Sequence, residues 1–260
     1  KVFQVRISYQ QKPGRLVLMK AYGGEVIPSP SPLTNSGKAI YDKDPNHPGS
    51  LGIAISEAVE ASMASDKIRY TLGSVVDFVL LYQTVIGQEA KIQMEMVNDY
   101  PDTIIGSIGG GSNFAGLALP FMKDKLEGKK PNLDFIGVEP AACPSMNRGK
   151  YVFDYGDSAK MAPIVKMYTL GHQFIPPPVH AGGLRYHGSA PILGVLKQMG
   201  MMRNDEVHQG EAIKAGLLFC NLEGLLPAPE TCHAVAQAIR EAKKAKENNE
   251  KKTILFNYSG

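Results

Sequence analysis

The sequence predicts an α/β protein with a largely parallel sheet, and two observations support this prediction. Segments typical of strands alternate with segments typical of helices over residues 3–28 and again over residues 101–142. In the second region a glycine-rich turn, Gly106–Gly116, separates a strand from a helix. A strand, a glycine turn and a helix in this order can bind a phosphate group through backbone N–H groups.

The first alternation predicts a compact strand–helix–strand unit. Phe3–Ser8 has the pattern of a strand, Lys12–Tyr22 that of a helix ended by two glycines, and Glu25–Pro28 that of a second strand. Residues 28–52 are rich in Ser, Pro, Asn and Gly and are expected to be irregular, as functional segments often are. Two helices are then expected, over residues 56–65 and 73–91.

The second half repeats the alternation. The expected elements are a strand over 103–108, a helix over 114–125 and a strand over 133–139. Residues 140–188 show almost no regular period and carry many Pro, Gly, His and Tyr residues, so we expect them to wrap over an active-site face. The remaining predictions are helices over 205–222 and 230–246 and a strand over 253–256.

Composition excludes several classes of protein. The 260 residues suffice for one large domain or two smaller ones, and 28 basic against 25 acidic residues leave a charge too small and too mixed for nucleic-acid binding. No apolar run reaches the ~20 residues that span a bilayer, so no membrane association is expected. Cys143, Cys220 and Cys232 share no C-x-x-C spacing, which predicts no metal site, no disulfide framework and a cytoplasmic location.

The glycine-rich turn predicts a bound phosphorylated cofactor. Gly109, Gly110 and Gly111 lack Cβ atoms, so their backbone can approach a ligand closely. Their N–H groups and the following helix N-terminus can converge on a dianion, to which Ser112 and Asn113 add polar side chains. The pattern is neither a Walker loop nor the dinucleotide fingerprint. A flexible surface loop is the alternative, and the flanking strand and helix disfavour it.

Seven short motifs follow one another through essentially the whole chain: Gln10–Pro13, Val26–Pro30, Pro48–Glu57, Gly106–Asn113, Gly182–Gly188, Glu223–Glu230 and Asn257–Gly260. Together they resemble the β subunit of tryptophan synthase, in its second, divergent type. The resemblance implies a fold-type-II enzyme with parallel-sheet layers and helices on both faces, and pyridoxal 5'-phosphate as cofactor. It also implies β-replacement, in which serine loses its β-substituent and indole adds. A homodimer is implied, whereas association with an α subunit is doubtful.

The resemblance also assigns residues to the cofactor. Gly109, Gly110, Gly111, Ser112 and Asn113 match the loop that binds the cofactor phosphate. Ser259 matches the serine that hydrogen-bonds the pyridine nitrogen; a neutral hydroxyl there favours elimination over transamination. Glu230 matches a carboxylate beside the cofactor ring, and an acid that stabilises a helix N-terminus is a second, compatible interpretation.

Arg185 departs from the common β subunit, which has an aspartate at this position. A guanidinium matches a phosphate bidentately, so we expect Arg185 to bind O-phosphoserine as well as, or instead of, serine. A structural arginine paired with a core acid is the alternative. Tyr186 and His187 could line the same pocket, although such residues are more often packed and hydrogen-bonded than catalytic.

The lysine that forms the Schiff base with the cofactor is expected to lie outside this sequence. In the family it follows a histidine, and no His-Lys pair occurs here; Lys1, Lys12, Lys20 and Lys38 lie in other matched segments. We therefore expect an incomplete N-terminal domain over residues 1–84 and a C-terminal, phosphate-binding domain over residues 85–260. A fragment of a longer enzyme is favoured over a natural non-catalytic truncation, and this piece alone should be inactive.

Two rival functions stay open. One is another fold-type-II enzyme, such as a serine or threonine dehydratase or cysteine synthase, although Arg185–Gly188 and Pro227–Glu230 argue against it. The other is a non-catalytic module that binds the cofactor or a phosphate. Consumption of indole would separate these from a tryptophan-forming enzyme.

Overall fold

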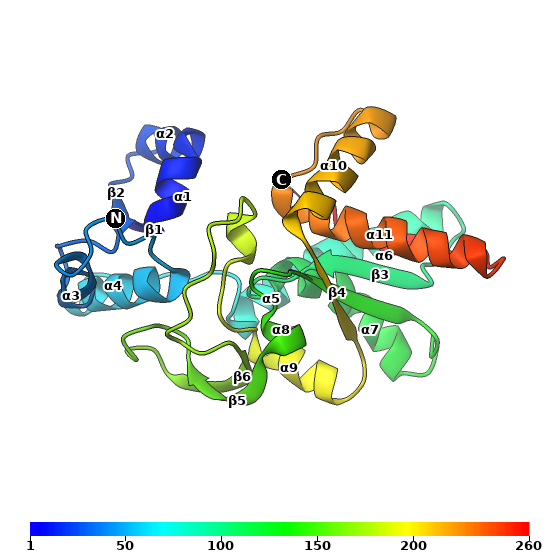
Figure 1. The fold of residues 1–260 in the computed structure, drawn as a ribbon. Coiled ribbons are helices and arrows are strands. Elements are labelled where there is room, and N and C mark those ends of the chain that lie inside the picture. Colours follow the sequence, from blue (N-terminus) through cyan, green and yellow to red (C-terminus); the bar gives the residue numbers. More distant parts are fainter. Residues whose placement is uncertain (260) are drawn as a thin grey trace.

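The largest sheet holds four parallel strands in the order β7 (Arg203–Val207), β4 (Asp134–Pro140), β3 (Thr103–Ser107) and β8 (Ile254–Phe256). The structure is a computed structural model that describes residues 1–259, so Gly260 of the last motif lies outside the described residues (Figure 1). Ile105 in β3 stands opposite Ile136 in β4 and Phe256 in β8. The prediction of an α/β protein with a largely parallel sheet is confirmed.

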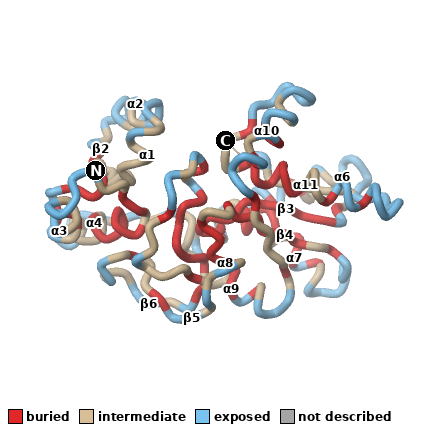
Figure 2. The backbone as a smooth tube through the Cα atoms, viewed as in Figure 1, coloured by how far each residue is buried: buried red, intermediate tan, exposed pale blue. Residues whose placement is uncertain are grey.

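Helices cover both faces of this sheet. Successive residues of a strand point to opposite sides, and here apolar side chains point to both sides and are buried under helices. Ile104 and Phe135 pack into one core, and Ile105 and Ile136 pack into the other. Figure 2 shows these buried inner surfaces along β3 and β4. The first core is shared with α7 (Ser112–Leu126) and α9 (Pro191–Gln198), and the second with α10 (Gln209–Glu223) and α11 (Pro229–Glu247).

The N-terminal part is a smaller unit that stands beside the four-stranded sheet (Figure 1). Its two strands, β1 (Val2–Val5) and β2 (Val26–Ser29), pair in parallel, and α1 (Arg6–Gln11) and α2 (Pro13–Ala21) connect them, so the predicted strand–helix–strand unit is confirmed. α3 (Asn35–Tyr41) and α4 (Leu51–Met63) follow. The side chains of Thr34 and Ser50 cap these two helices by accepting hydrogen bonds from backbone N–H groups.

Three expectations for residues 1–96 are corrected. The strand ends at Val5 rather than Ser8, and the segment expected to be irregular contains α3. The single helix expected over residues 73–91 is two helices, α5 (Asp77–Gln83) and α6 (Val85–Met96). The break falls at Thr84, whose hydroxyl donates to the Leu81 carbonyl oxygen and so competes with the helical hydrogen bonds.

The segment 140–188 also has more regular structure than expected. It contains α8 (Ser145–Arg148), an antiparallel pair of strands, β5 (Lys150–Tyr155) and β6 (Ile164–Thr169), and a single turn of 3₁₀ helix, η1 (Gly182–Leu184). Figure 1 shows the yellow-green chain that carries η1 rising between the N-terminal unit and the large sheet. The segment therefore wraps over the face where the two parts meet.

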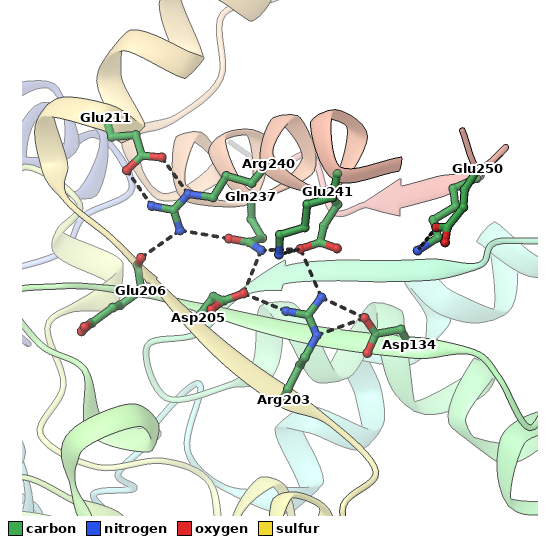
Figure 3. A network of polar contacts seen from close by, with 11 residues as sticks. Asp134, Arg203, Asp205, Glu206, Glu211, Gln237, Arg240, Glu241 and Glu250 are labelled. Carbon is green, nitrogen blue, oxygen red and sulfur yellow. Dashed lines mark hydrogen bonds and ion pairs between the residues drawn. The ribbon is translucent and has the colours of Figure 1, made fainter. Parts of the chain in front are cut away.

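The helix expected over residues 205–222 begins instead as strand β7. An edge strand needs few apolar residues, and the side chains of β7 are held by charges (Figure 3). Arg203 contacts Asp134, Asp205 and Glu241, at N–O distances of 3.0, 2.8 and 3.1 Å, and so ties β7 to β4 and α11. Among the helices that the structure describes, none is long and apolar enough to cross a membrane.

Candidate active site

The glycine-rich turn lies between the end of β3 and the start of α7, as the sequence predicts. Gly111 precedes the first residue of α7 and has a φ of +124°, which a residue with a side chain adopts only with strain. No side chain within residues 1–259 caps this helix, so its first N–H groups are left for another acceptor. The turn thus presents backbone donors at a positive helix end, where an anion binds favourably.

Packing explains why three consecutive glycines are required. A Cβ atom on Gly109 would lie 2.3 Å from the Gly183 carbonyl oxygen, and one on Gly110 would lie 2.6 Å from Ser74 Oγ. A Cβ on Gly111 would lie 2.4 Å from Leu193 Cδ1. The turn is therefore a fixed part of the structure, which is inconsistent with a flexible surface loop.

The C-terminal strand brings Ser259 to the same place. Asn113 Nδ2 donates to Ser259 Oγ at 2.8 Å, and Asn257 Nδ2 donates to the Asn113 carbonyl oxygen at 2.9 Å. Thr231 Oγ1 also lies 3.2 Å from Ser259 Oγ. These residues meet because β3 and β8 are parallel neighbours and both carboxyl ends lie at one edge of the sheet, where ligands bind in open α/β folds.

Glu230 lies in the first turn of α11 and faces the segment that carries η1. Its carboxylate accepts hydrogen bonds from the Gly183 N–H at 2.8 Å and from Lys12 Nζ at 3.3 Å. Burial would raise the pKa of Glu230, but these donors outweigh burial and hold the pKa below its usual value. The side chain is therefore a charged carboxylate within the site as well as an acid at a helix N-terminus.

Arg185 is 7% exposed and follows η1. Its Nη2 donates to Ser8 Oγ, while Nη1 is buried with no hydrogen-bond partner among the described residues. Arg185 makes no ion pair with a carboxylate in the part of the chain that the structure describes, so the pairing with a core acid that the alternative requires is not found. A buried guanidinium N–H group without a partner is costly, and an anion would satisfy it.

Tyr186 and His187 have structural roles here. The Tyr186 hydroxyl donates to the Gly156 carbonyl oxygen at 2.8 Å, and His187 Nε2 lies 2.9 Å from the Tyr155 carbonyl oxygen. Burial raises the pKa of Tyr186 and lowers the pKa of His187. Both side chains are packed and hydrogen-bonded within the molecule, in line with the more common role of such residues.

Three polar residues at this site are not among the predicted site residues: Ser8, Lys12 and Ser74. Ser8 and Lys12 lie more than 170 residues from Arg185 and Glu230, so no local spacing could have joined them. Ser74 precedes α5 and touches the turn at Gly110. A single serine or lysine in the sequence does not indicate that the residue belongs to a binding site.

The residues fit a phosphorylated cofactor because the turn offers uncapped N–H groups at a positive helix end. A cavity of about 810 Å³ is lined mainly by α4 and residues 64–73, and none of the predicted site residues lines it. The polar site and this cavity are therefore separate features.

Comparison with known proteins agrees with the geometry. A family described as pyridoxal-phosphate dependent enzyme matches residues 4–260. "Tryptophan synthase beta chain 2" of Aquifex aeolicus is 54% identical over the whole chain, and the chain covers 60% of that protein. The protein of the same name in Pyrococcus abyssi is 56% identical, and 59% of it is covered.

A solved structure shows the fold. A threonine deaminase from T.th. aligns over 96% of this chain and 67% of its own, with a TM-score of 0.61 at 18% identity. The chain thus spans about 60% of the length of the curated relatives that it matches.

Proposed function

The chain belongs to the family of pyridoxal-phosphate dependent enzymes, and on this basis we propose that the protein forms L-tryptophan by β-replacement, from indole and L-serine or O-phospho-L-serine. The relatives that carry the name tryptophan synthase beta chain support the reaction, since more than half of the residues are identical along the whole chain. The observation that carries the proposal is the hydrogen bond from Asn113 to Ser259, which joins the glycine turn to a neutral hydroxyl.

Each residue of the site has a proposed task. The backbone N–H groups of Gly109, Gly110 and Gly111, together with Ser112 and Asn113, would hold the cofactor phosphate. Ser259 would hydrogen-bond the pyridine nitrogen, and Glu230 would lie beside the ring. Bound there, pyridoxal 5'-phosphate supplies an electron sink for charge at the substrate Cα.

Ser259 determines how strongly that sink draws charge. A carboxylate would keep the pyridine nitrogen protonated, whereas a neutral hydroxyl does not. Less negative charge therefore moves into the ring, and expulsion of the β-substituent is favoured over transamination. Asn113 and Thr231 hold the hydroxyl in place through contacts of 2.8 and 3.2 Å. The proton transfer at Cα is proposed to need a lysine from outside this chain.

Arg185 is proposed to bind the phosphate of O-phospho-L-serine. Its Nη1 is buried and has no hydrogen-bond partner in the described part of the chain, and a guanidinium binds phosphate oxygens in pairs. Substrate preference in the full-length protein tests this role. We expect tryptophan formation with O-phosphoserine to exceed that with serine, and Arg185→Asp to reverse the order. An unchanged order of preference in the variant would contradict the role of Arg185.

The wider organisation is also a proposal. We propose a homodimer in the cytoplasm, without a firm complex with an α subunit, and a division into residues 1–84 and a phosphate-binding domain over residues 85–260. The three cysteines are free, which agrees with a reducing compartment. Indole consumption tests the reaction itself, because a dehydratase would release an oxo acid and leave indole unchanged.

A further inference from the structure

The carboxylate of Glu230 is held at only one of its two oxygens. Oε1 accepts hydrogen bonds from the Gly183 N–H at 2.8 Å and from Lys12 Nζ at 3.3 Å. Oε2 accepts no hydrogen bond from another residue within residues 1–259, and it is not among the buried atoms of that range. Two donors on one oxygen fix the direction of the carboxylate and leave the second oxygen available as an acceptor for a bound molecule.

The backbone and the stem of Glu230 are fixed from the large sheet. Ser107 Oγ, at the end of β3, donates to the Glu230 carbonyl oxygen at 2.7 Å. A Cβ atom on Gly183 would lie 3.2 Å from Glu230 Cγ, so the absence of a side chain there permits the close approach. The Gly183 carbonyl oxygen in turn packs against Gly109 of the turn. Glu230 therefore lies against the residue that borders the proposed phosphate site.

Lys12 reaches Glu230 from the other part of the protein. It lies between α1 and α2, where its backbone N–H donates to the Ser8 carbonyl oxygen and its own carbonyl oxygen accepts from the Arg15 N–H. The side chains of Lys12 and Glu230 are only 18% and 16% exposed, so salt screens their attraction weakly. Of the two donors to the carboxylate, Lys12 is the one that carries a charge and belongs to the N-terminal unit.

Other titratable groups near Glu230 act on it less directly. Arg185, which follows η1, is close enough for the charge of Glu230 to influence its pKa. Cys232 and His233 lie near Glu230 in α11, and burial raises the pKa of the thiol and lowers the pKa of the imidazole, so both are neutral at pH 7. Among these groups Lys12 is the one that contacts the carboxylate.

We infer that Lys12 is a positioning residue, which holds Oε1 of Glu230 and leaves Oε2 as a fixed acceptor for the bound cofactor. This inference rests on the proposed function, in which Glu230 lies beside the cofactor ring. The contact also couples the two parts of the protein, because Lys12 reaches Glu230 only while the N-terminal unit packs against the large sheet. When the unit moves away, burial still raises the pKa of the carboxylate, Lys12 no longer lowers it, and the direction of the side chain is no longer fixed.

The protonation of Glu230 tests this role without relying on turnover. The measurement is NMR of the full-length protein saturated with pyridoxal 5'-phosphate, with isotope-labelled glutamate carboxyl carbons and Glu230→Gln to identify the signal. Lys12→Met should move the titration midpoint of Glu230 to higher pH, because the carboxylate stays buried and loses a cation. Lys12→Arg should restore the lower midpoint. Lys20→Met removes an equal charge from an exposed position of α2 and should leave the midpoint unchanged.

Hydrogen exchange tests the coupling between the two parts. The backbone N–H groups of α1 and α2 should exchange roughly 3–10-fold faster in Lys12→Met, because a charged hydrogen bond that holds the N-terminal unit is lost. Glu230→Gln weakens the same contact and should have a similar effect, and the double variant should exchange no faster than Lys12→Met. Should Lys12→Met fail to fold, Lys12→Gln keeps a neutral donor and should still raise the midpoint of Glu230.

The pH profile of activity supplies a third measurement. The acid limb of kcat/KM should move to higher pH in Lys12→Met, because Glu230 becomes protonated more readily. A lysine with a merely structural role would lower kcat/KM by the same factor at every pH.

The outcomes separate this inference from the proposed function. The same midpoint of Glu230 in Lys12→Met and the unmodified protein overturns the positioning role, even if the protein makes tryptophan. An equal shift in Lys20→Met also overturns it, because the effect would then come from net charge alone. Additive effects of Lys12→Met and Glu230→Gln on exchange overturn the coupling. If indole is not consumed while Lys12→Met still raises the midpoint, the proposed function fails and the contact between Lys12 and Glu230 stands.

Discussion

Replacement of Gly111 by alanine tests whether the turn before α7 is fixed by both backbone conformation and packing. The backbone has a φ of +124°, where a side chain adds strain of about 1–3 kcal/mol. The new Cβ would also lie 2.4 Å from Leu193 Cδ1, whose side chain is fully buried, and overpacking of this kind costs about 1–3 kcal/mol. Together the two effects predict a loss of roughly 2–6 kcal/mol in the free energy of unfolding.

The matched control lies just beyond the other end of the same helix. Gly128 has a φ of +72°, and apart from its own chain neighbours no atom of the described residues lies within 4 Å of its Cβ position. Gly128→Ala therefore adds backbone strain alone, about 1–2 kcal/mol. Urea denaturation of both variants measures the difference. If Gly111→Ala destabilises the protein no more than Gly128→Ala, the claim that Leu193 packs against the turn is wrong.

Two further predictions concern stability. Burial raises the pKa of Glu139 from 4.5 to about 7, although three hydrogen-bond donors at α8 favour its charged form. Between about pH 5 and pH 7 the folded state therefore holds a proton that the unfolded state releases. The free energy of unfolding should then fall as the pH rises through this range. Urea denaturation at about pH 5 and pH 7 should show a fall of up to about 3 kcal/mol in the free energy of unfolding, and Glu139→Gln should reduce this fall. If the free energy of unfolding depends on pH in the same way in the variant and the unmodified protein, the raised pKa of Glu139 is contradicted. Arg203→Met breaks the contacts with Asp134 and Glu241 and should lower the free energy of unfolding by about 1–2 kcal/mol, and by less in 1 M salt. Lys38→Met removes an exposed ion pair and should lower it by under about 0.5 kcal/mol. Equal effects of the two substitutions on the midpoint of thermal unfolding would show that the network around Arg203 adds nothing.

The sheet and its helices follow closely from the sequence where apolar residues have a clear period. β3, β4 and α7 match the predicted elements to within two residues. β3 and β4 are short apolar runs buried on both faces, and α7 buries many apolar residues, so all three stand out in the sequence. The edge strand β7 was predicted as a helix start, since its side chains are polar and held by ion pairs rather than by a core. A pattern of hydrophobicity carries no information about such a strand.

The site was predictable only in part, for a related reason. The glycine turn has a local signature, and the parallel pairing of β3 with β8 brings Ser259 to it. The contacts of Lys12 and Ser8 with Glu230 and Arg185 join residues far apart in the chain, and they depend on how two units pack. Neither spacing nor composition encodes that packing, so only the fold shows that Lys12 belongs to the site.

Comparison of pyridoxal 5'-phosphate with pyridoxal tests the central claim most directly, because the two molecules differ only in the group that the glycine turn is proposed to hold. The measurement is the dissociation constant of each for the full-length protein. Several charge-assisted hydrogen bonds of about 1.5–3 kcal/mol each predict that pyridoxal binds at least about 100-fold more weakly, and that Gly111→Ala removes most of this difference. Equal affinity for the two molecules would contradict the account.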